Sequence, residues 1–302
     1  MLLIVKARHS RALAKEILRA EVCAVFERYS PKALQGGPLG DRPHMHWFEL
    51  DAGPQDPRIP LLASHLGYAE CVWRLLPIPE DDWRRGQPAL VRWRKEPYRL
   101  DLIYKLDRDV EKQRDPDRRL FLLVDSSGQV REVRGYRGDG QPSSRRALPV
   151  CDARVLVNLA RPRQGGTLWD PFAGIGGVIL EAKLLDIRTL SVDIDPRVAP
   201  GLSQIADRHM VADSTSMELE SESIDCVATE LPFHKGSEEL FEPLSRQLAH
   251  ILSVGGYVSI LAAEWQGTLL RESLERYLVV HMDASLDRKG SSCRLLCARR
   301  VH

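Results

Sequence analysis

Residues 170–177, with the sequence DPFAGIGG, constrain the fold of this chain more than any other segment. They lie between a strand-like apolar run at 167–169 and a helix-like run at 178–185. A glycine-rich turn at such a junction lets a ligand approach the backbone closely, and the following helix N-terminus offers free N–H groups. The segment therefore predicts an α/β domain with a ligand-binding turn.

Two further strand ends carry polar residues of the same kind. Asp193 ends a second apolar run and lies 19 residues after Gly174, which is the spacing of an acidic residue that accepts hydrogen bonds from ribose hydroxyls. Asp213 follows a short run at 209–212, and the segment 229–233 follows another at 224–228. Ligands bind at the carboxyl ends of strands in such sheets, so these loops predict a nucleoside site.

From residue 167 onward strand-like and helix-like segments alternate, which predicts a doubly wound, mainly parallel sheet. No helix separates the last two strands, so we expect the final strand to be antiparallel. The predicted strands are 167–171, 189–193, 224–229, 255–261, 277–283 and 292–298, and the predicted helices are 176–186, 197–206, 237–252 and 266–275.

The glycine pattern helps to choose the cofactor. There is no GxGxxG directly followed by a helix and no Lys-Ser/Thr after the glycines, so NAD and ATP fit less well than S-adenosylmethionine (SAM). We expect the loop backbone to meet the methionine part of SAM, Asp170 its ammonium group, Asp193 the ribose and Asp213 the adenine amino group. The expected cofactor-binding residues are Asp170, Phe172, Ala173, Gly174, Gly176, Asp193, Ile194, Asp213 and Ser214. No metal is expected.

The segment Glu230-Leu231-Pro232-Phe233 is the expected catalytic loop. An exocyclic amine on a base is a poor nucleophile, because its lone pair is delocalised into the ring. A carboxylate and a backbone carbonyl that accept hydrogen bonds from the amine point this lone pair at the methyl group. A stacked aromatic ring fixes the base plane. Glu230 would supply the carboxylate, Leu231 the carbonyl, Pro232 rigidity and Phe233 the stacking face.

The first half of the chain has a different character. Residues 1–76 read as strand, helix (9–26), strand, helix and strand, which fits a small α+β module of the ferredoxin type. Residues 77–149 are rich in arginine with interleaved Trp and Tyr, and they contain a predicted hairpin at 120–124 and 129–134. Arginine with aromatic side chains can bind RNA phosphates and stack on bases, although a solvated surface sheet is the plain alternative.

Charge supports this division. Residues 1–149 carry a net charge of +6 (27 Lys and Arg against 21 Asp and Glu), and residues 150–302 carry −5 (16 against 21). A basic half joined to an acidic half suggests that the first contacts a polyanion and the second performs chemistry. We expect three parts: a ferredoxin-like module (1–76), an Arg-rich region (77–149) and a cofactor-binding domain (150–302).

Composition excludes some classes. No run of about 18 apolar residues is present, so no membrane span is expected. The six cysteines are scattered without zinc-ligand spacing, which indicates reduced thiols in or near the core of a cytoplasmic protein.

The segment 170–182, together with DARVLVNLAR at 152–161, resembles the THUMP-associated RNA methyltransferases, which include the archaeal tRNA guanosine-10 N2-methyltransferases. The resemblance covers about 150–302 well and is visible at 1–76. It implies a Rossmann-like SAM methyltransferase domain, an N-terminal ferredoxin-like and reduced THUMP-type part, and methylation of guanine N2 in tRNA. Some members of the family use a small activating protein subunit, which stays open here, as does the oligomeric state.

Two departures from the family pattern keep alternatives open. The usual catalytic loop is Asp-Pro-Pro-Tyr, whereas this chain has Glu-Leu-Pro-Phe, and residues 77–149 are short for a complete THUMP domain. A DNA amino methyltransferase acting on adenine N6 or cytosine N4 shares the Asp-Pro-Phe and Pro-aromatic elements. A weakly catalytic SAM-binding module that binds RNA or a partner is the third reading.

Overall fold

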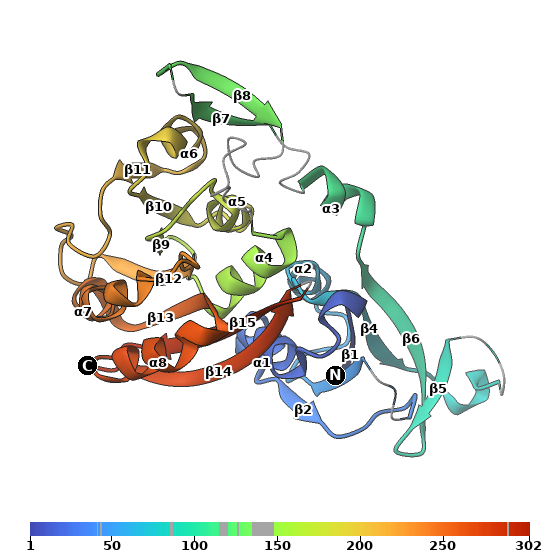
Figure 1. Ribbon diagram of the computed structural model, residues 1–302. Helices are drawn as coiled ribbons and strands as arrows, with labels where there is room; N and C mark the ends of the chain where they lie inside the picture. The colour runs from blue at the N-terminus through green and yellow to red at the C-terminus, as the bar shows by residue number, and fades with distance from the viewer. Residues whose placement is uncertain are drawn as a thin grey trace. The chain divides into compact units, whose positions relative to one another are not determined.

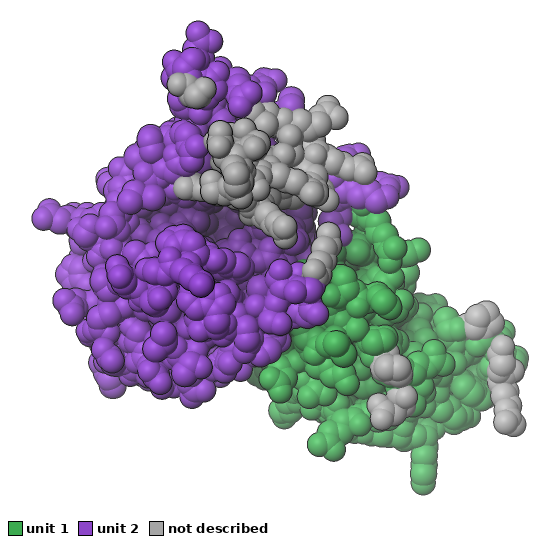
Figure 2. All heavy atoms as spheres, in the orientation of Figure 1, with its two compact units in different colours: residues 1–108 green, residues 109–302 purple. Residues whose placement is uncertain are grey.

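The computed structural model describes residues 1–40, 42, 44–84, 87, 89–114, 120–125, 127–134, 148–288 and 290–302. It forms two compact units, Met1–Arg108 and Asp109–His302, which Figure 2 shows in different colours. The three-part division at residues 76/77 and 149/150 remains a prediction.

Unit 1 is built on one antiparallel sheet of order β2-β3-β1-β4-β6-β5 (Figure 1). Its elements are β1 (Leu2–Ala7), α1 (Lys15–Val25), β2 (Lys32–Leu34), β3 (Met45–Glu49), α2 (Arg58–Ser64), β4 (Ala69–Pro77), β5 (Leu90–Trp93) and β6 (Glu96–Lys105). The first four strands and two helices have the connectivity and the β2-β3-β1-β4 order of a ferredoxin-like module. The strand-helix-strand-helix-strand pattern predicted for 1–76 is therefore present, with the additional short strand β2.

Helix α1 begins later than predicted. The pattern suggested a helix from His9, but residues 9–11 form a 3-10 turn and the α-helix starts at Lys15. Leu13 lies within the predicted helix 9–26, but it is 90% exposed because it precedes the observed α1. Ile17, Leu18 and Val22 are fully buried, as an amphipathic helix requires.

Part of the predicted Arg-rich region belongs to the sheet of unit 1. Strand β6 pairs with β4 and β5, a feature that charge density at 90–105 had hidden. Two of the interleaved aromatic rings lie under guanidinium groups: Arg92 over Trp83 at 4.8 Å and Arg94 over Trp93 at 5.6 Å. Other arginines of this stretch lie outside the described residues: Arg85, Arg118, Arg119, Arg137, Arg145 and Arg146.

Unit 2 is a doubly wound sheet of order β11-β10-β9-β12-β13-β15-β14. Its elements are α3 (Arg108–Arg114, beginning at the last residue of unit 1), β7 (Leu120–Val124), β8 (Val130–Arg134), α4 (Val150–Leu159), β9 (Thr167–Asp170), α5 (Gly177–Lys183), β10 (Arg188–Asp193), α6 (Ala199–Ile205), β11 (Arg208–Val211), β12 (Ile224–Glu230), α7 (Phe241–Ile251), β13 (Leu252–Ala263), α8 (Gly267–Glu275), β14 (Val279–Arg288) and β15 (Ser291–Arg299).

The pairings of this sheet confirm the predicted fold class. Strands β9 to β13 pair in parallel, and the final strand β15 is antiparallel to both β13 and β14. The predicted hairpin is also confirmed as β7–β8, which forms a separate two-stranded ladder.

Helices cover both faces of the unit 2 sheet. Parallel crossovers are right-handed, so α5 and α6, on one side of β9, cover one face, while α7 and α8 cover the other. A hydrophobic core lies between the sheet and helices α7 and α8, and its residues Trp169, Val227 and Leu248 are fully buried. Among the described residues, no helix is both long and apolar enough to cross a membrane. All six cysteines are free, and four of them are buried.

Candidate functional site

The sheet topology brings three of the predicted polar residues to one edge. Strand β9 lies between β10 and β12, and all three run in the same direction. Their carboxyl ends are Asp170, Asp193 and Glu230. The carboxyl edge of such a sheet is where α/β domains bind ligands, and here it holds three carboxylates from separate parts of the chain.

Backbone contacts fix the glycine-rich loop against β10. The Ala173 amide donates to the Val192 carbonyl at 2.9 Å, and the Gly174 amide donates to Asp193 Oδ2 at 2.8 Å. Gly176 has φ +82°, which favours glycine, and a Cβ there would lie 2.3 Å from Ile205 Cδ1, so a larger residue would have to displace the Ile205 side chain. Gly174 has φ +53°, and a Cβ on it would meet no described atom within 4 Å. The loop is thus packed behind Gly176 and open at Gly174.

Asp170 is a buried carboxyl group with few partners. It is 2% exposed, and its Oδ1 accepts hydrogen bonds from Thr229 Oγ1 at 2.7 Å and from the Phe172 amide at 3.3 Å. Burial, with smaller contributions from the Asp193 and Glu230 charges, raises the pKa of Asp170 to about 7. A cation placed beside this group would restore its charge at neutral pH, which suits an ammonium ligand.

Asp193 holds the glycine-rich loop and places a carboxylate beside it. Its Oδ2 accepts from the Gly174 amide at 2.8 Å and its Oδ1 from the Asp195 amide at 2.9 Å. Carboxylate oxygens are acceptors of the kind that ribose hydroxyls need. The next side chain, Ile194, is 69% exposed, and an apolar side chain standing free at this edge can pack on a ligand ring.

The third predicted acidic residue is held by its own turn. Asp213 is exposed and accepts, through Oδ1, the amide of Thr215 at 2.9 Å and its hydroxyl at 2.8 Å. These hydrogen bonds lower the pKa of Asp213, so it is ionised at neutral pH. Ser214 is 2% exposed. Both follow β11, which pairs with β10, so they lie on the same edge as Asp193.

Glu230 forms an ion pair that sequence reasoning did not predict. Its Oε1 is bonded to the guanidinium of Arg288, whose Nε lies 3.3 Å from Asp152 Oδ2. Arg288 comes from the end of β14 and Asp152 from α4, so three distant segments meet here. Burial raises the pKa of Glu230, and Arg288 opposes the shift through its charge and hydrogen bond. The arginine therefore favours the ionised form of an otherwise poorly solvated carboxyl group.

The rest of the predicted catalytic loop is positioned by neighbouring strands and helices. The Leu231 amide donates to the Leu261 carbonyl at 2.8 Å, which continues the β12–β13 pairing, and the Leu231 side chain is buried. The Pro232 carbonyl accepts from Gln266 Nε2 at 2.9 Å, and the same nitrogen lies 2.7 Å from Ser237 Oγ. Phe233 is 40% exposed. An aromatic ring exposed on a fixed loop is available for stacking, whereas Phe172 packs partly against the core.

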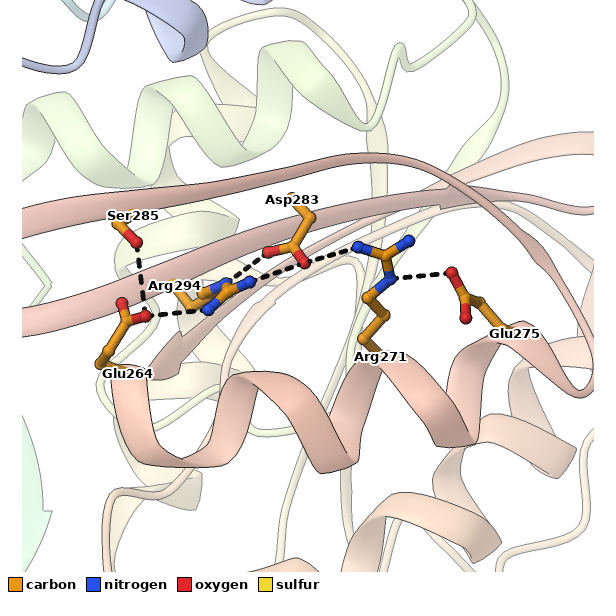
Figure 3. A network of polar contacts seen from close by, with 6 residues as sticks. All are labelled: Glu264, Arg271, Glu275, Asp283, Ser285 and Arg294. Atoms are coloured by element: carbon orange, nitrogen blue, oxygen red, sulfur yellow. Dashed lines mark hydrogen bonds and ion pairs between the residues drawn. The ribbon is translucent and has the colours of Figure 1, made fainter.

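A charged network next to Gln266 supports this arrangement (Figure 3). Arg294 on β15 contacts Glu264 at 2.9 Å and Asp283 at 2.9 Å, and Arg271 on α8 joins Asp283 to Glu275. Because Glu264 and Gln266 are two residues apart, the network fixes the turn from which Gln266 reaches the Pro232 carbonyl.

The residues that sequence reasoning missed share one property. Arg288, Asp152, Thr229 and Gln266 all act on predicted site residues through contacts between segments far apart in the chain. Only two of them lie in segments that the sequence had singled out. Asp152 belongs to the segment 152–161 that carries the family resemblance, and Thr229 begins the segment 229–233 that follows a predicted strand.

Comparison with known proteins agrees with the fold and the resemblance. No family model matches the chain. It is 28% identical over 127 residues to the tRNA (guanine(10)-N2)-dimethyltransferase of Methanothermobacter thermautotrophicus, covering 37% of this chain and 38% of the relative. It is also 28% identical over 121 residues to the enzyme of the same name from Methanocaldococcus jannaschii, covering 35% and 34%. The chain thus spans a little over a third of the length of these relatives.

Among solved structures, TrmN from Thermus thermophilus matches 99% of both chains with a TM-score of 0.52 and 15% sequence identity. This likeness shows a common fold over the whole length of the chain. The resemblance inferred from residues 152–182 is therefore confirmed: the chain is similar in sequence to curated tRNA (guanine(10)-N2)-dimethyltransferases, and it has the fold of TrmN.

Proposed function

We propose that this protein is a SAM-dependent RNA methyltransferase that transfers a methyl group to the exocyclic N2 of a guanosine in tRNA. The observation that carries the proposal is the meeting of three loops at one sheet edge: the glycine loop, Asp193 with its ribose-type spacing, and Glu230 to Phe233. The names of the curated relatives support guanine N2 in tRNA as the target.

The residues at this edge fit SAM. The open side of Gly174 leaves room for a ligand, Asp170 offers a buried carboxyl group to the methionine ammonium, and Asp193 offers acceptors to the ribose. Phe172, Ala173 and Gly176 shape the loop, while Ile194, Asp213 and Ser214 would surround the adenine. Bound SAM supplies an electrophilic methyl group on a sulfonium, so the protein needs to supply only orientation and proton acceptance.

Glu230 would orient the guanine amine. Its carboxylate accepts a hydrogen bond from one N2–H, the Leu231 carbonyl accepts a hydrogen bond from the other, and the nitrogen lone pair then points at the methyl group. Methyl transfer forms the N–C bond, breaks the C–S bond and leaves a cationic amine whose proton passes to Glu230 or to water. Phe233 would stack on the base and fix its plane.

Arg288 gives Glu230 a defined geometry. With Oε1 bonded to the guanidinium, the other oxygen remains to face the substrate, and the extra methylene of Glu relative to Asp is held in one conformation. We propose Arg288 as a positioning residue that acts through Glu230, with Asp152 holding the guanidinium from behind.

The same ion pair also favours the non-catalytic alternative, because a carboxylate neutralised by arginine could be purely structural.

The test is to supply the purified protein with methyl-labelled SAM and unmodified total tRNA, ribosomal RNA or duplex DNA, and to measure SAM binding by calorimetry. Label in tRNA supports the proposal, whereas label in DNA alone, or SAM binding without transfer to any nucleic acid, contradicts it.

A further inference from the structure

A group of cationic side chains lies toward the end of the unit 2 sheet that is opposite to the candidate site. Tyr257, near the start of β13, has the Arg161 guanidinium 4.6 Å and the Arg299 guanidinium 5.2 Å from its ring centre. His281 contacts the ring edge-on with centroids 5.7 Å apart. Tyr257 faces the α4 side of the sheet, because Ser259, two residues further along β13, bonds the Leu156 carbonyl of α4.

Arg163 and Arg299 converge on one point. A Cβ built on Gly255 would lie 3.4 Å from a terminal nitrogen of Arg299 and 3.8 Å from one of Arg163. Both arginines are exposed, and neither has a carboxylate partner among the described residues. Two guanidinium groups this close repel each other, and one phosphate between them could bond both.

The neighbouring carboxylates are already engaged. Glu222 pairs with Arg300 at 3.0 Å, and Asp225 accepts the Thr167 amide at 2.7 Å. This small basic group lies within residues 150–302, which are acidic overall with a net charge of −5. Exposed arginines grouped in an otherwise acidic domain indicate a surface that attracts an anion, rather than one that only keeps the protein soluble.

The conformation of Arg161 adds a second indication. Arg161 follows α4 with φ +49°, a left-handed position that helices usually fill with glycine or asparagine. An arginine there is conformationally unfavourable. Its stacking on Tyr257 offsets that cost and adds a third positive charge to the group.

We propose that Arg163 and Arg299, whose guanidinium groups meet beside Gly255, bind a backbone phosphate of the RNA substrate. The proposal rests on the proposed function for the source of the phosphate. Leu261, which pairs with Glu230, is six residues beyond Gly255 on β13, about 20 Å along the strand at 3.3 Å per residue. The bound phosphate is therefore a few nucleotides from the target guanosine, and it contributes affinity and register rather than base recognition.

The first experiment tests the site without requiring methyl transfer. Sodium pyrophosphate is titrated into the protein carrying ¹⁵N-histidine, and the His281 resonance, assigned with His281→Asn, is followed. Burial and the charges of Arg161 and Arg299 lower the pKa of His281, so an anion bound between the arginines should raise it. We expect a saturable shift in the wild type and in Arg246→Gln/Arg276→Gln, whose arginines already face Glu242, and no shift in Arg163→Gln/Arg299→Gln.

The second experiment assigns the phosphate to RNA. In Arg163→Gln/Arg299→Gln, we expect the tRNA affinity to fall about tenfold, and the dependence of log affinity on log salt to fall by about 0.7 for the one lost phosphate contact. Where tRNA is methylated, KM should rise with kcat unchanged. The Arg246→Gln/Arg276→Gln control should match the wild type in each measurement.

The outcomes separate this proposal from the proposed function. Unchanged tRNA affinity in the Arg163/Arg299 variant overturns the RNA assignment, even if pyrophosphate binds and wild-type protein methylates tRNA. Conversely, absence of methyl transfer by the wild type would sink the proposed function, while loss of RNA and pyrophosphate binding in that variant would still support the phosphate site.

Discussion

The two ligand loops of unit 2 are held in different ways. The glycine loop at 170–177 is fixed mainly by backbone amides and by carboxylates at the ends of adjacent strands. The proposed catalytic loop at 230–233 depends on side chains from β14, α4 and the turn before α8. A loop of the first kind is determined by nearby sequence, whereas a loop of the second kind depends on tertiary contacts. Substitutions should therefore affect cofactor binding and catalysis separately.

The largest expected effect is on catalysis. Glu230→Gln removes the anionic acceptor while keeping the shape of the side chain, and kcat should fall about 10³-fold, within the range for loss of a proton acceptor. SAM affinity should stay within twofold of the wild type. Steady-state kinetics and calorimetry measure the two, and Glu239→Gln, an exposed neighbour, is the control. A kcat near that of the wild type would remove Glu230 from the mechanism.

The next effect lies in the glycine loop. Asp170→Asn removes the charge offered to the SAM ammonium, and SAM should bind about 100-fold more weakly, as expected for loss of a charge-assisted hydrogen bond of about 2.7 kcal/mol. The fold should not suffer. Because the pKa of Asp170 is raised to about 7, its stabilising contribution is present at low pH and lost as pH rises through 7.

The melting temperature of Asp170→Asn minus that of the wild type should therefore be larger at pH 8 than at pH 6. Thermal denaturation at both pH values checks this. If the relative stability instead favoured the wild type at pH 8, the assigned direction of the Asp170 pKa shift would be wrong.

A smaller effect tests the ion pair. In Arg288→Gln the pKa of Glu230 should rise further, because the neighbouring positive charge that lowers it is lost, so the acidic limb of the kcat profile should move to higher pH. We expect about a tenfold loss of kcat at pH 7 with partial recovery near pH 9. Arg288→Lys should restore the pH profile in part, since it keeps the charge but not the two-sided contact with Glu230 and Asp152.

A purely structural role for Arg288 predicts another result. The melting temperature would fall and kcat would drop equally at every pH, with no shift of the profile. Comparison of the Gln and Lys variants at matched folded fractions separates the two possibilities.

The smallest expected effect concerns Thr229, the buried residue that joins the two loops. Thr229→Val removes the hydrogen bond to Asp170 and should raise the Asp170 pKa, so SAM affinity at pH 7 should fall about threefold and recover near pH 9.

In the wild type, SAM affinity should rise with pH up to about 8 and then level off, because the ionised form of Asp170 binds the ammonium. Calorimetry in buffers of different ionisation enthalpy should detect the released proton, and a pH-independent affinity would contradict the assignment.

The sequence predicted those features of the fold that depend on local sequence pattern. The strand ends at Asp170, Asp193 and Glu230 were predicted to within one residue, and the antiparallel last strand was predicted as well. It missed β5 and β6, because arginines and prolines there masked the strand alternation. It also missed Arg288 and Gln266, since pairing between residues 58 and 34 positions apart leaves no local signal. The predicted roles of the site residues remain to be measured.

The most direct test of this account is to identify the labelled nucleoside. Wild-type protein and Glu230→Gln are each incubated with methyl-labelled SAM and unmodified tRNA, and the RNA is digested and separated. We predict N2-methylguanosine from the wild type and almost none from the variant, although both bind SAM. Label in another nucleoside, or equal label from both proteins, would contradict the account.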